Sequence, residues 1–555
     1  MKLRNRWVGL VFISMAISLV IIDSTIVNTI FPNIIQDLMI RSSEVQWVQE
    51  SYVLVFASML LVWGSLADRF GRRFILLLGI GIFVAASFRA GFADDGTSLI
   101  IARVIQGVGG AMVLPTTLSL VNANFQGKDR GIAFAIWGST IGAMVAIGPV
   151  VGGWLATNLS WNWAFLVNIP VGLIIIIGLL VFVPESKSEN PSKGIDFVGA
   201  IFSMILFGFL VFALIEGRLY GWFFVNPLHR EFQIGDFKWA KEGISVIPIA
   251  LAIALIALVA FVLYERRRAQ NGKPVILDLD LFKISSFRNG SIAALIVSLG
   301  EFGLVFAIPL WLQGVLALDS VSAGMVLLWL AVGAFLASVV GGVLSNKLPP
   351  VQSVRLGLAL EAIGLLGIAI FASNTGGWWS IAVWLLIYGI GVGLATAQLT
   401  NVIMVDVPLE QVGQASGTQS TTRQVGSALG IAVLGTILFT SSTSFVGNYV
   451  ENQPTLQEMN LVTRQTFASI PANYVTETSG VIVKDMDKFL MNSKVPQDIA
   501  EEAKANSERG FLDAVKVTSS AAAIFLGLGL VSTVGLDRKK SKRKPAAKKA
   551  ATTKD

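Results

Sequence analysis

Three charged residues lie inside long apolar runs, where an unpaired charge is costly unless it faces water. Asp23 stands in "SLVIIDSTIVN", Arg103 in "SLIIARVIQGVGG" and Glu301 in "IVSLGEFGLVF". A carboxylate that exchanges its proton as a cavity opens to alternate sides is the minimum machinery for coupling to a proton gradient. The pattern therefore predicts a proton-coupling or substrate-binding role for Asp23 and Arg103. A purely structural ion pair is the alternative.

Lipid must be the main solvent of the elements that position these charges. Of the 555 residues, 54% are hydrophobic and 14% charged, and the mean hydropathy is +0.71. Apolar stretches of about 20 residues span a bilayer as helices. We expect fourteen spans, which makes the fold all-α: 7–30, 46–67, 74–93, 98–122, 132–156, 163–183, 196–215, 244–264, 287–310, 322–345, 353–373, 378–401, 415–439 and 515–536.

Several kinds of site are excluded by composition. The chain has no cysteine and one histidine, which excludes disulfides, thiolate metal sites and histidine-rich centres, so neither a metal nor a cofactor is expected. No G-x-x-x-x-G-K-[ST] loop occurs, so ATP-driven pumping is not supported and an enzyme is the least favoured class. A small molecule, protons and membrane lipid are the expected partners.

The distribution of Lys and Arg sets the expected orientation. Basic residues collect at the N-terminus, in loops such as 265–273, and in the tail 537–555, whose charge equals the net +7 of the chain. We interpret the tail as held at the anionic inner leaflet rather than bound to nucleic acid. Both termini are then cytoplasmic in a multi-pass protein of the cell membrane. The long polar segment 441–512 lies outside, where an accessory envelope protein has room to bind; the chain is expected to be a monomer.

The stretch "GSLADRFGRR" (64–73) forms a short cytoplasmic turn between two spans. Arginines alone would set topology, but they leave the acid and the glycines unexplained. Gly64 permits close approach of another helix and Gly71 a tight turn. Asp68 can accept hydrogen bonds from a helix N-terminus or pair with an arginine. We interpret the stretch as a latch between two moving halves, made of Gly64, Asp68, Arg69, Gly71, Arg72 and Arg73.

This stretch resembles the loop signature of the major facilitator superfamily, G-x-L-A-D-R-x-G-R-[KR], at every signature position. Other stretches resemble motifs of its fourteen-span drug:proton antiporters, the EmrB and QacA type: "IIDSTIVNTIFP" (21–32), "RVIQGVGGA" (103–111), "GAMVAIGPVVGG" (142–153) and "WNWAFLVNIP" (161–170), where Asn162 replaces the usual arginine. The resemblance implies a major facilitator fold and export rather than import.

A row of glycines with a proline in the fifth span allows close packing and a bend. These residues are Gly148, Pro149, Gly152 and Gly153. We interpret them as a hinge; an ordinary glycine packing face is the alternative.

A shift of about 280 residues aligns the two halves of the chain, as in many secondary transporters. It places Asp23 on Glu301, with a one-residue uncertainty in register. The expected organisation is a six-helix bundle (1–190), two inserted helices (191–270), a second six-helix bundle (271–536) and the tail. Isolated in the bilayer, Glu301 would favour its neutral form until a cation bound. Glu361 and Arg423, at similar depth, are expected to pair in a structural or gating role.

The sequence thus favours proton-coupled export of amphipathic, cationic drugs or toxic compounds. Acids in an apolar, aromatic-rich cavity attract such cations without demanding one shape. An exporter of a metabolite, lipid or peptide is the alternative within transport. A sensor or scaffold without transport is less favoured, because it gains nothing from paired charges in the bilayer.

Overall fold

The protein is a bundle of long helices, seen here in a computed structural model that describes residues 3–39, 42–187, 196–225, 232–234, 237–240, 242–344, 348–477 and 483–536. The basic tail and the expected boundary near residue 190 lie outside these residues. The first part of the chain forms α1 (Leu3–Leu38), α2 (Ser42–Phe70), α3 (Arg72–Gly91), α4 (Gly96–Asn124), α5 (Gly127–Asn158), α6 (Trp163–Leu166) and α7 (Asn168–Phe182).

The remainder of the described chain is also mainly helical. Two helices follow, α8 (Phe197–Tyr220) and α9 (Val246–Gln270), with the two-residue strands β1 (Gln233–Ile234) and β2 (Phe237–Lys238) paired antiparallel between them. The last part forms α10 (Ser285–Gly314), α11 (Ser320–Leu344), α12 (Pro350–Phe371), α13 (Trp379–Met404), α14 (Val412–Glu451), α15 (Leu461–Glu477), α16 (Met486–Asn492) and α17 (Gln497–Ser532).

Apolar runs become helices because a backbone in lipid must satisfy its own hydrogen bonds. Polar residues mark several helix starts: Asp95 accepts a 2.8 Å bond from the Ser98 N–H at α4, and Asp196 accepts one from the Gly199 N–H at α8. Within the described residues, eleven segments are long and apolar enough to cross a membrane: α1 to α4, α6 with α7, α8, α9, α12, α13, α14 and α17. The expected spans 132–156 and 287–310 fall in α5 and α10, and residues 322–344 of the expected span 322–345 fall in α11.

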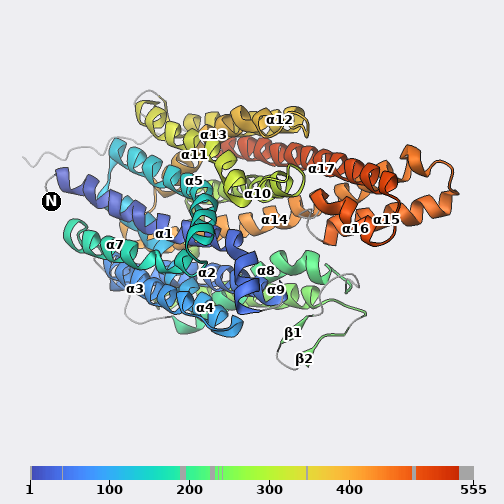
Figure 1. The fold of residues 1–555 in the computed structure, drawn as a ribbon. Helices are drawn as coiled ribbons and strands as arrows, with labels where there is room; N and C mark the ends of the chain where they lie inside the picture. The colour runs from blue at the N-terminus through green and yellow to red at the C-terminus, as the bar shows by residue number, and fades with distance from the viewer. Residues whose placement is uncertain are drawn as a thin grey trace, which may run out of the picture.

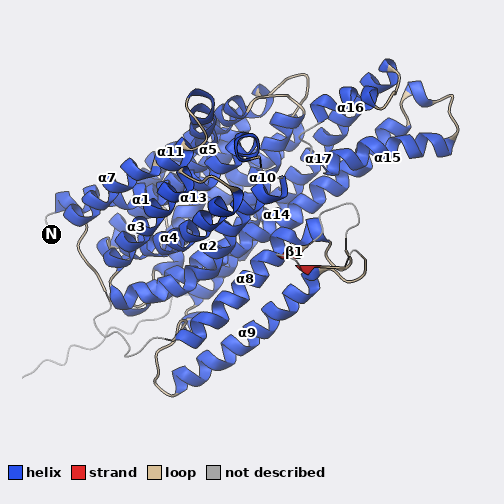
Figure 2. Cartoon of the chain, turned by 60° about the horizontal axis from the view of Figure 1, so that its bottom comes forward, coloured by secondary structure: helices blue, strands red, loops and turns tan. Residues whose placement is uncertain are grey.

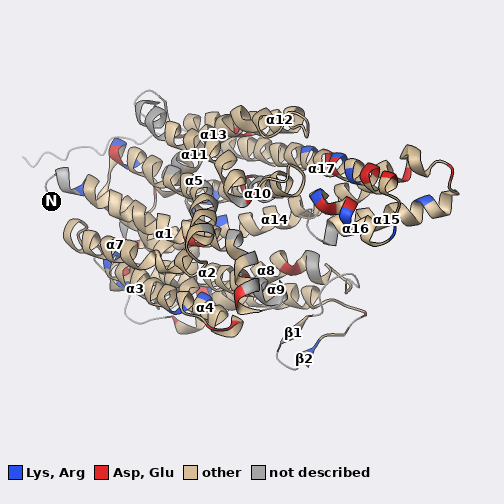
Figure 3. Ribbon diagram, viewed as in Figure 1, with Lys and Arg blue, Asp and Glu red and all other residues tan. Residues whose placement is uncertain are grey.

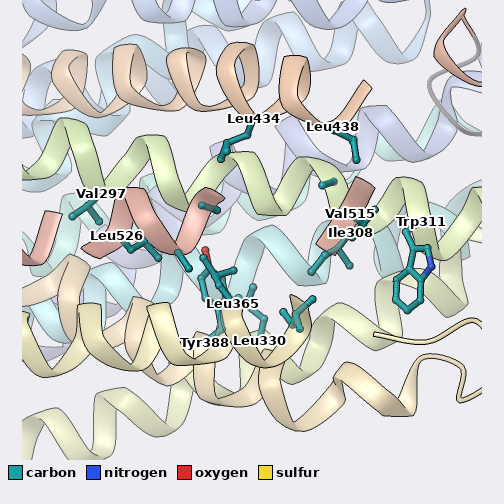
Figure 4. Packing of buried hydrophobic residues seen from close by; sticks show 14 of the residues in the cluster. Val297, Ile308, Trp311, Leu330, Leu365, Tyr388, Leu434, Leu438, Val515 and Leu526 are labelled. Carbon is teal, nitrogen blue, oxygen red and sulfur yellow. The ribbon is translucent and has the colours of Figure 1, made fainter. Parts of the chain in front are cut away.

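The two halves of the bundle have their own buried cores. Residues of α1 to α5 and α7, such as Leu10, Leu60 and Phe134, form one cluster. The other is built mainly by α10 to α14 and α17 and also includes Leu61 and Val62 of α2. Figure 4 shows Tyr388, Leu365 and Leu330 of this cluster packed together where α11, α12 and α13 meet. In Figure 1, α1 to α4 and α10 to α13 occupy different sides of the bundle, with α5 lying near α11.

The inserted helices α8 and α9 lie side by side along the bundle (Figure 2). α8 contacts both halves, because Val211 and Leu214 pack against Ala57 of α2 and against Val425 and Ala428 of α14. The pair therefore covers the line along which α2 meets α14.

A helical extension projects from one end of the bundle (Figure 1). α14 has 40 residues, a length of about 60 Å, which is about twice the thickness of the hydrocarbon core. The described residues of the segment 441–512 are largely helical: α14 continues to Glu451, α17 begins at Gln497, and α15 and α16 pack between them. Charged residues gather on this extension, whereas much of the bundle between the ends is tan in Figure 3, the colour of uncharged residues.

Candidate functional site

Asp23 of α1 and Arg103 of α4 form an ion pair inside the first half. The Arg103 Nη1 atom lies 2.5 Å from Asp23 Oδ2, and both side chains are fully buried. The other carboxylate oxygen, Oδ1, accepts hydrogen bonds from Asn168 of α7 at 2.8 Å and from Gln106 of α4 at 3.1 Å. The carboxylate is thus held by three donors from two helices.

Arg103 is held as completely as its partner. Its guanidinium donates to Gln106 Oε1 at 2.8 Å, to Gln49 Oε1 at 3.2 Å and to the Val48 carbonyl at 3.1 Å. The guanidinium carbon also lies 4.2 Å from the centroid of the Tyr52 ring, a favourable position for a cation over an aromatic face. The pair is a tightly satisfied network, with polar partners for each charge in the bilayer.

Glu301 of α10 occupies a looser arrangement in the second half. Its Oε1 accepts a 3.1 Å hydrogen bond from Thr396 of α13, and its Oε2 lies 3.5 Å from Arg423 Nη2 of α14. Glu301 is 5% exposed, while the Arg423 side chain is 20% exposed. The hydroxyl of Tyr388 donates to the Glu301 carbonyl at 3.3 Å.

Two expectations about these residues are wrong. Glu301 is not isolated, because Arg423 neutralises it across α10 and α14. Glu361 of α12 does not pair with Arg423: it is fully buried, and neither carboxyl oxygen has a hydrogen-bond partner among the described residues. Similar depth along two helices does not decide which acid a flexible arginine reaches.

Asp68 lies where α2 ends and meets the first turn of α14. Its Oδ2 accepts hydrogen bonds from the backbone N–H groups of Gly413 at 2.6 Å and Gln414 at 3.2 Å. Its Oδ1 accepts from Arg72 at 2.7 Å and 3.1 Å. A carboxylate at a helix N-terminus satisfies free N–H groups and the positive end of the helix dipole. Asp68 therefore joins the first half of the chain to the second.

The turn after Asp68 is held by contacts within the first half of the chain. Gly71 has φ +114°, a conformation that favours glycine, and an added Cβ would lie 2.7 Å from the Glu185 carboxyl carbon. Glu185 accepts 2.9 Å bonds from the N–H groups of Arg73 and Phe74 at the start of α3. Arg73 also donates to the Val183 carbonyl at 3.0 Å. Arg69 stacks over Phe70, at 5.4 Å from the ring centroid.

Further contacts close this end of the bundle. Arg130 of α5 donates to Asn401 of α13 at 3.0 Å, and Gln398 donates to the Gly131 carbonyl at 3.4 Å. Gly64 lies against backbone, since a Cβ there would stand 2.6 Å from the Gly413 carbonyl oxygen. α2 and α14 thus cross with no side chain between them at Gly64.

The glycines of α5 pack against α1 near Asp23. A Cβ on Gly148 would overlap the Thr25 hydroxyl, and one on Gly152 would lie 3.2 Å from Ile26 Cα. Pro149 and Gly153 are in the same helix. The glycine row therefore allows α5 to pack closely on α1. Among the described residues, no group of three or more His, Asp or Glu side chains is placed to hold a metal ion.

Sequence reasoning missed several residues of these clusters. Gln106 and Asn168 lie inside two of the quoted motif stretches, and a polar amide in an apolar run was the available signal. Tyr388, Thr396 and Glu185 had no comparable signal, because their partners come from distant parts of the chain.

Two helical halves, joined at one end and each holding buried charges, define the class as a multi-span membrane protein with a charged interior. Residues 13–431 match the Major Facilitator Superfamily, and the chain belongs to that superfamily. The human organic anion transporter MFSD10 has a similar fold, with a TM-score of 0.55 at 12% identity, over 95% of this chain and 99% of that one.

Bacterial relatives resemble the chain more closely in sequence. It is 32% identical over 434 residues to the multidrug efflux pump LfrA of Mycolicibacterium smegmatis, covering 78% of this chain and 81% of that one. It is 29% identical over 437 residues to the tetracenomycin C resistance and export protein of Streptomyces glaucescens, covering 79% and 77%. The multidrug transporter protein MdtP of Bacillus subtilis is 26% identical over 540 residues, covering 96% and 94%.

Proposed function

We propose that this protein is a proton-coupled exporter of amphipathic, cationic drugs or toxic compounds across the cytoplasmic membrane. The observation that carries the proposal is the Glu301–Arg423 pair. Its acid is buried in the bundle, its N–O distance is 3.5 Å, and its arginine is partly exposed. A carboxylate held this loosely can exchange its counter-ion for a proton or an organic cation. The names of the relatives, multidrug efflux pump and multidrug transporter, support the substrate class.

In this proposal the chain crosses the membrane fourteen times as a monomer, with both termini cytoplasmic. Six spans in 1–190 and six in 271–536 form the moving halves, and 191–270 adds the inserted pair. Asp23 and Glu301 are the coupling carboxylates, and Arg103 is the counter-ion of Asp23. The latch residues close the cytoplasmic end, the glycine row of α5 is a hinge, and 537–555 lies at the inner leaflet.

The proposal is tested with inverted membrane vesicles that accumulate a fluorescent cationic dye. We expect dye uptake to require a proton gradient and to stop when an uncoupler collapses it. Vesicles lacking the protein are the control. Uptake that continues unchanged in the presence of the uncoupler would contradict proton antiport.

Export of a metabolite is the second candidate, because one relative is named as a tetracenomycin C resistance and export protein. Tetracenomycin C that competes with dye uptake at a lower concentration than an organic cation does would favour it.

Neutralising Glu301 is expected to separate charged from uncharged substrates. In Glu301→Gln, a cation loses a charged partner worth about 1.5–3 kcal/mol, so export of monovalent cations should fall about tenfold or more while neutral compounds are less affected. Glu301→Asp, which keeps the charge, should retain partial function. Initial efflux rates of matched cationic and neutral dyes measure the ratio. Equal loss for both dyes would count against a role in cation recognition.

The latch interpretation predicts that Asp68→Asn slows export. An amide keeps one acceptor oxygen where the carboxylate uses two, so the Gly413 and Arg72 bonds cannot both be kept. We expect normal insertion and export slowed about tenfold, since hydrogen bonds to a charged group contribute about 1.5–3 kcal/mol. Asp129→Asn is the matched control, because Asp129 is 41% exposed and its partner, Arg6, belongs to the same half. Equal rates in the two variants would show that the latch does not limit transport.

A further inference from the structure

Glu361 is a buried acid that the proposed function has not used. Its side chain is fully buried in α12, and both carboxyl oxygens are without a hydrogen-bond partner in the part of the chain that the structure describes. α13 approaches it through Gly391, where an added Cβ would lie 2.6 Å from the Glu361 N atom and 2.7 Å from its Cγ. An ionised carboxylate with no donor in such a place is strongly disfavoured. The neutral acid fits this site.

The groups that face Glu361 are few. Glu301 of α10 and Arg423 of α14 act on its charge, and Tyr388 of α13 is the third titratable neighbour. α11 contains no ionisable residue between Ser320 and Leu344.

α17 also packs on α12, but its charges are distant. Arg355 near the start of α12 contacts Thr533 just after α17 ends, so the two helices run in opposite directions. Glu361 lies six residues beyond Arg355, and Lys516, the last charged residue of α17, lies seventeen residues before Thr533. At 1.5 Å per residue, Lys516 is about 16 Å from Glu361 along the helix axes. Glu301 and Arg423 are therefore its charged partners.

Arg423 can change partner in a way that Arg103 cannot. Arg103 donates to four acceptors, the closest at 2.5 Å. Arg423 has Glu301 at 3.5 Å and Thr396 at 3.4 Å, and its side chain is 20% exposed. Glu301, Glu361, Arg423 and one proton together carry no net charge. The proton and the arginine can therefore exchange between the two carboxyl groups without changing that charge.

We propose that Glu361 holds the proton that leaves when an organic cation binds beside Glu301. The cation takes the place of Arg423 on the Glu301 carboxylate. Arg423 then turns to Glu361, whose O–H bond breaks. The proton passes to water, and the new carboxylate pairs with Arg423. One positive charge enters the set and one leaves it, so its net charge is unchanged. This inference rests on the proposed function and adds the group that stores the proton.

The test uses the purified full-length protein in lipid nanodiscs, in weakly buffered solution with a pH-indicator dye. Ethidium, a monovalent organic cation, is the probe. We expect the wild type to release about one proton per ethidium bound, and Glu361→Gln to bind ethidium with at least tenfold less release. Glu265→Gln is the matched control, since Glu265 is another buried glutamate, on α9, that accepts a 3.2 Å bond from the Ile276 N–H. This variant should release as many protons as the wild type.

Binding measured against pH gives a second readout. Release of one proton on binding makes ethidium affinity rise with pH, by about tenfold per unit where Glu361 is protonated in the free protein. The affinity of Glu361→Gln should change less than twofold over the same range. Glu301→Gln should instead lose affinity at every pH.

If Glu361→Gln does not fold, the wild type still decides the question. Ethidium should remove the infrared carbonyl band of a protonated carboxylic acid, and Glu361→Asp should shift that band. An unchanged band overturns the inference. So does undiminished proton release from Glu361→Gln. In each of these cases uncoupler-sensitive dye uptake by wild-type vesicles leaves the proposed function standing, whereas uncoupler-insensitive uptake removes both.

Discussion

Replacing Arg103 with alanine is expected to abolish transport and to destabilise the fold by about 3–5 kcal/mol, the usual cost of removing one partner from a buried ion pair. Arg103 and Asp23 are both fully buried. Without the guanidinium, Asp23 keeps the Asn168 and Gln106 bonds but loses its counter-charge. Gln49 and the Val48 carbonyl lose a donor at the same time.

Thermal unfolding followed by fluorescence-detected size exclusion, alongside vesicle dye uptake, measures both effects. Two variants are matched controls. Arg423→Ala removes the arginine of the Glu301 pair, which is looser and partly exposed, and should destabilise the protein less. Asp23→Asn keeps an oxygen acceptor for Arg103, so it should fold and carry neutral substrates in part while losing proton coupling. An Arg103→Ala protein that unfolds at the wild-type temperature would show that Asp23 is satisfied without its partner.

The second large effect is expected from Gly64→Ala. A methyl group there would stand 2.6 Å from the Gly413 carbonyl oxygen and 2.7 Å from Gly417 Cα. Both are backbone atoms of α14, so α2 and α14 must separate at the end that Asp68 closes. Overpacking of this kind costs about 1–3 kcal/mol, and we expect the closed arrangement to lose population about tenfold or more.

Thiol labelling reports this opening without background, because the chain has no cysteine. Gln398 is 3% exposed and contacts Gly131 across the two halves, so Gln398→Cys should react slowly with a polar maleimide. Adding Gly64→Ala should accelerate the reaction about tenfold. Gly81→Ala is the control, since a Cβ on that glycine of α3 meets nothing within 4 Å. The same acceleration from Gly81→Ala would point to a general loosening.

Much of this architecture is predictable from the sequence, because lipid imposes simple rules. A helix in the bilayer needs about 20 apolar residues, so the long runs, and the charges that interrupt them, can be recognised from hydropathy alone. Asp23 and Arg103 stand out on this ground. Asp68 stands out too, because an acid at a helix end between glycines has few suitable partners other than a helix N-terminus or an arginine.

The sequence does not determine which acid pairs with which arginine. Glu301 and Glu361 are both within electrostatic reach of Arg423, and the arginine takes Glu301 because α10 packs directly on α14. The Gly391 approach that leaves Glu361 without donors among the described residues depends on the packing of α12 on α13. Neither fact follows from hydropathy or spacing.

The position of α8 makes the two junctions between the halves, α2 with α14 and α5 with α11, differ in their exposure to the bilayer. α8 sits across the line where α2 meets α14, and α9 behind it presents Leu255, Ile256 and Val259 at 51–69% exposure, as a surface facing acyl chains does. Lipid tails are thereby screened from one junction of the halves, while α5 and α11 meet at the other without such a screen among the described helices. An amphipathic compound dissolved in a leaflet thus finds one shielded flank and one open to the annular lipid.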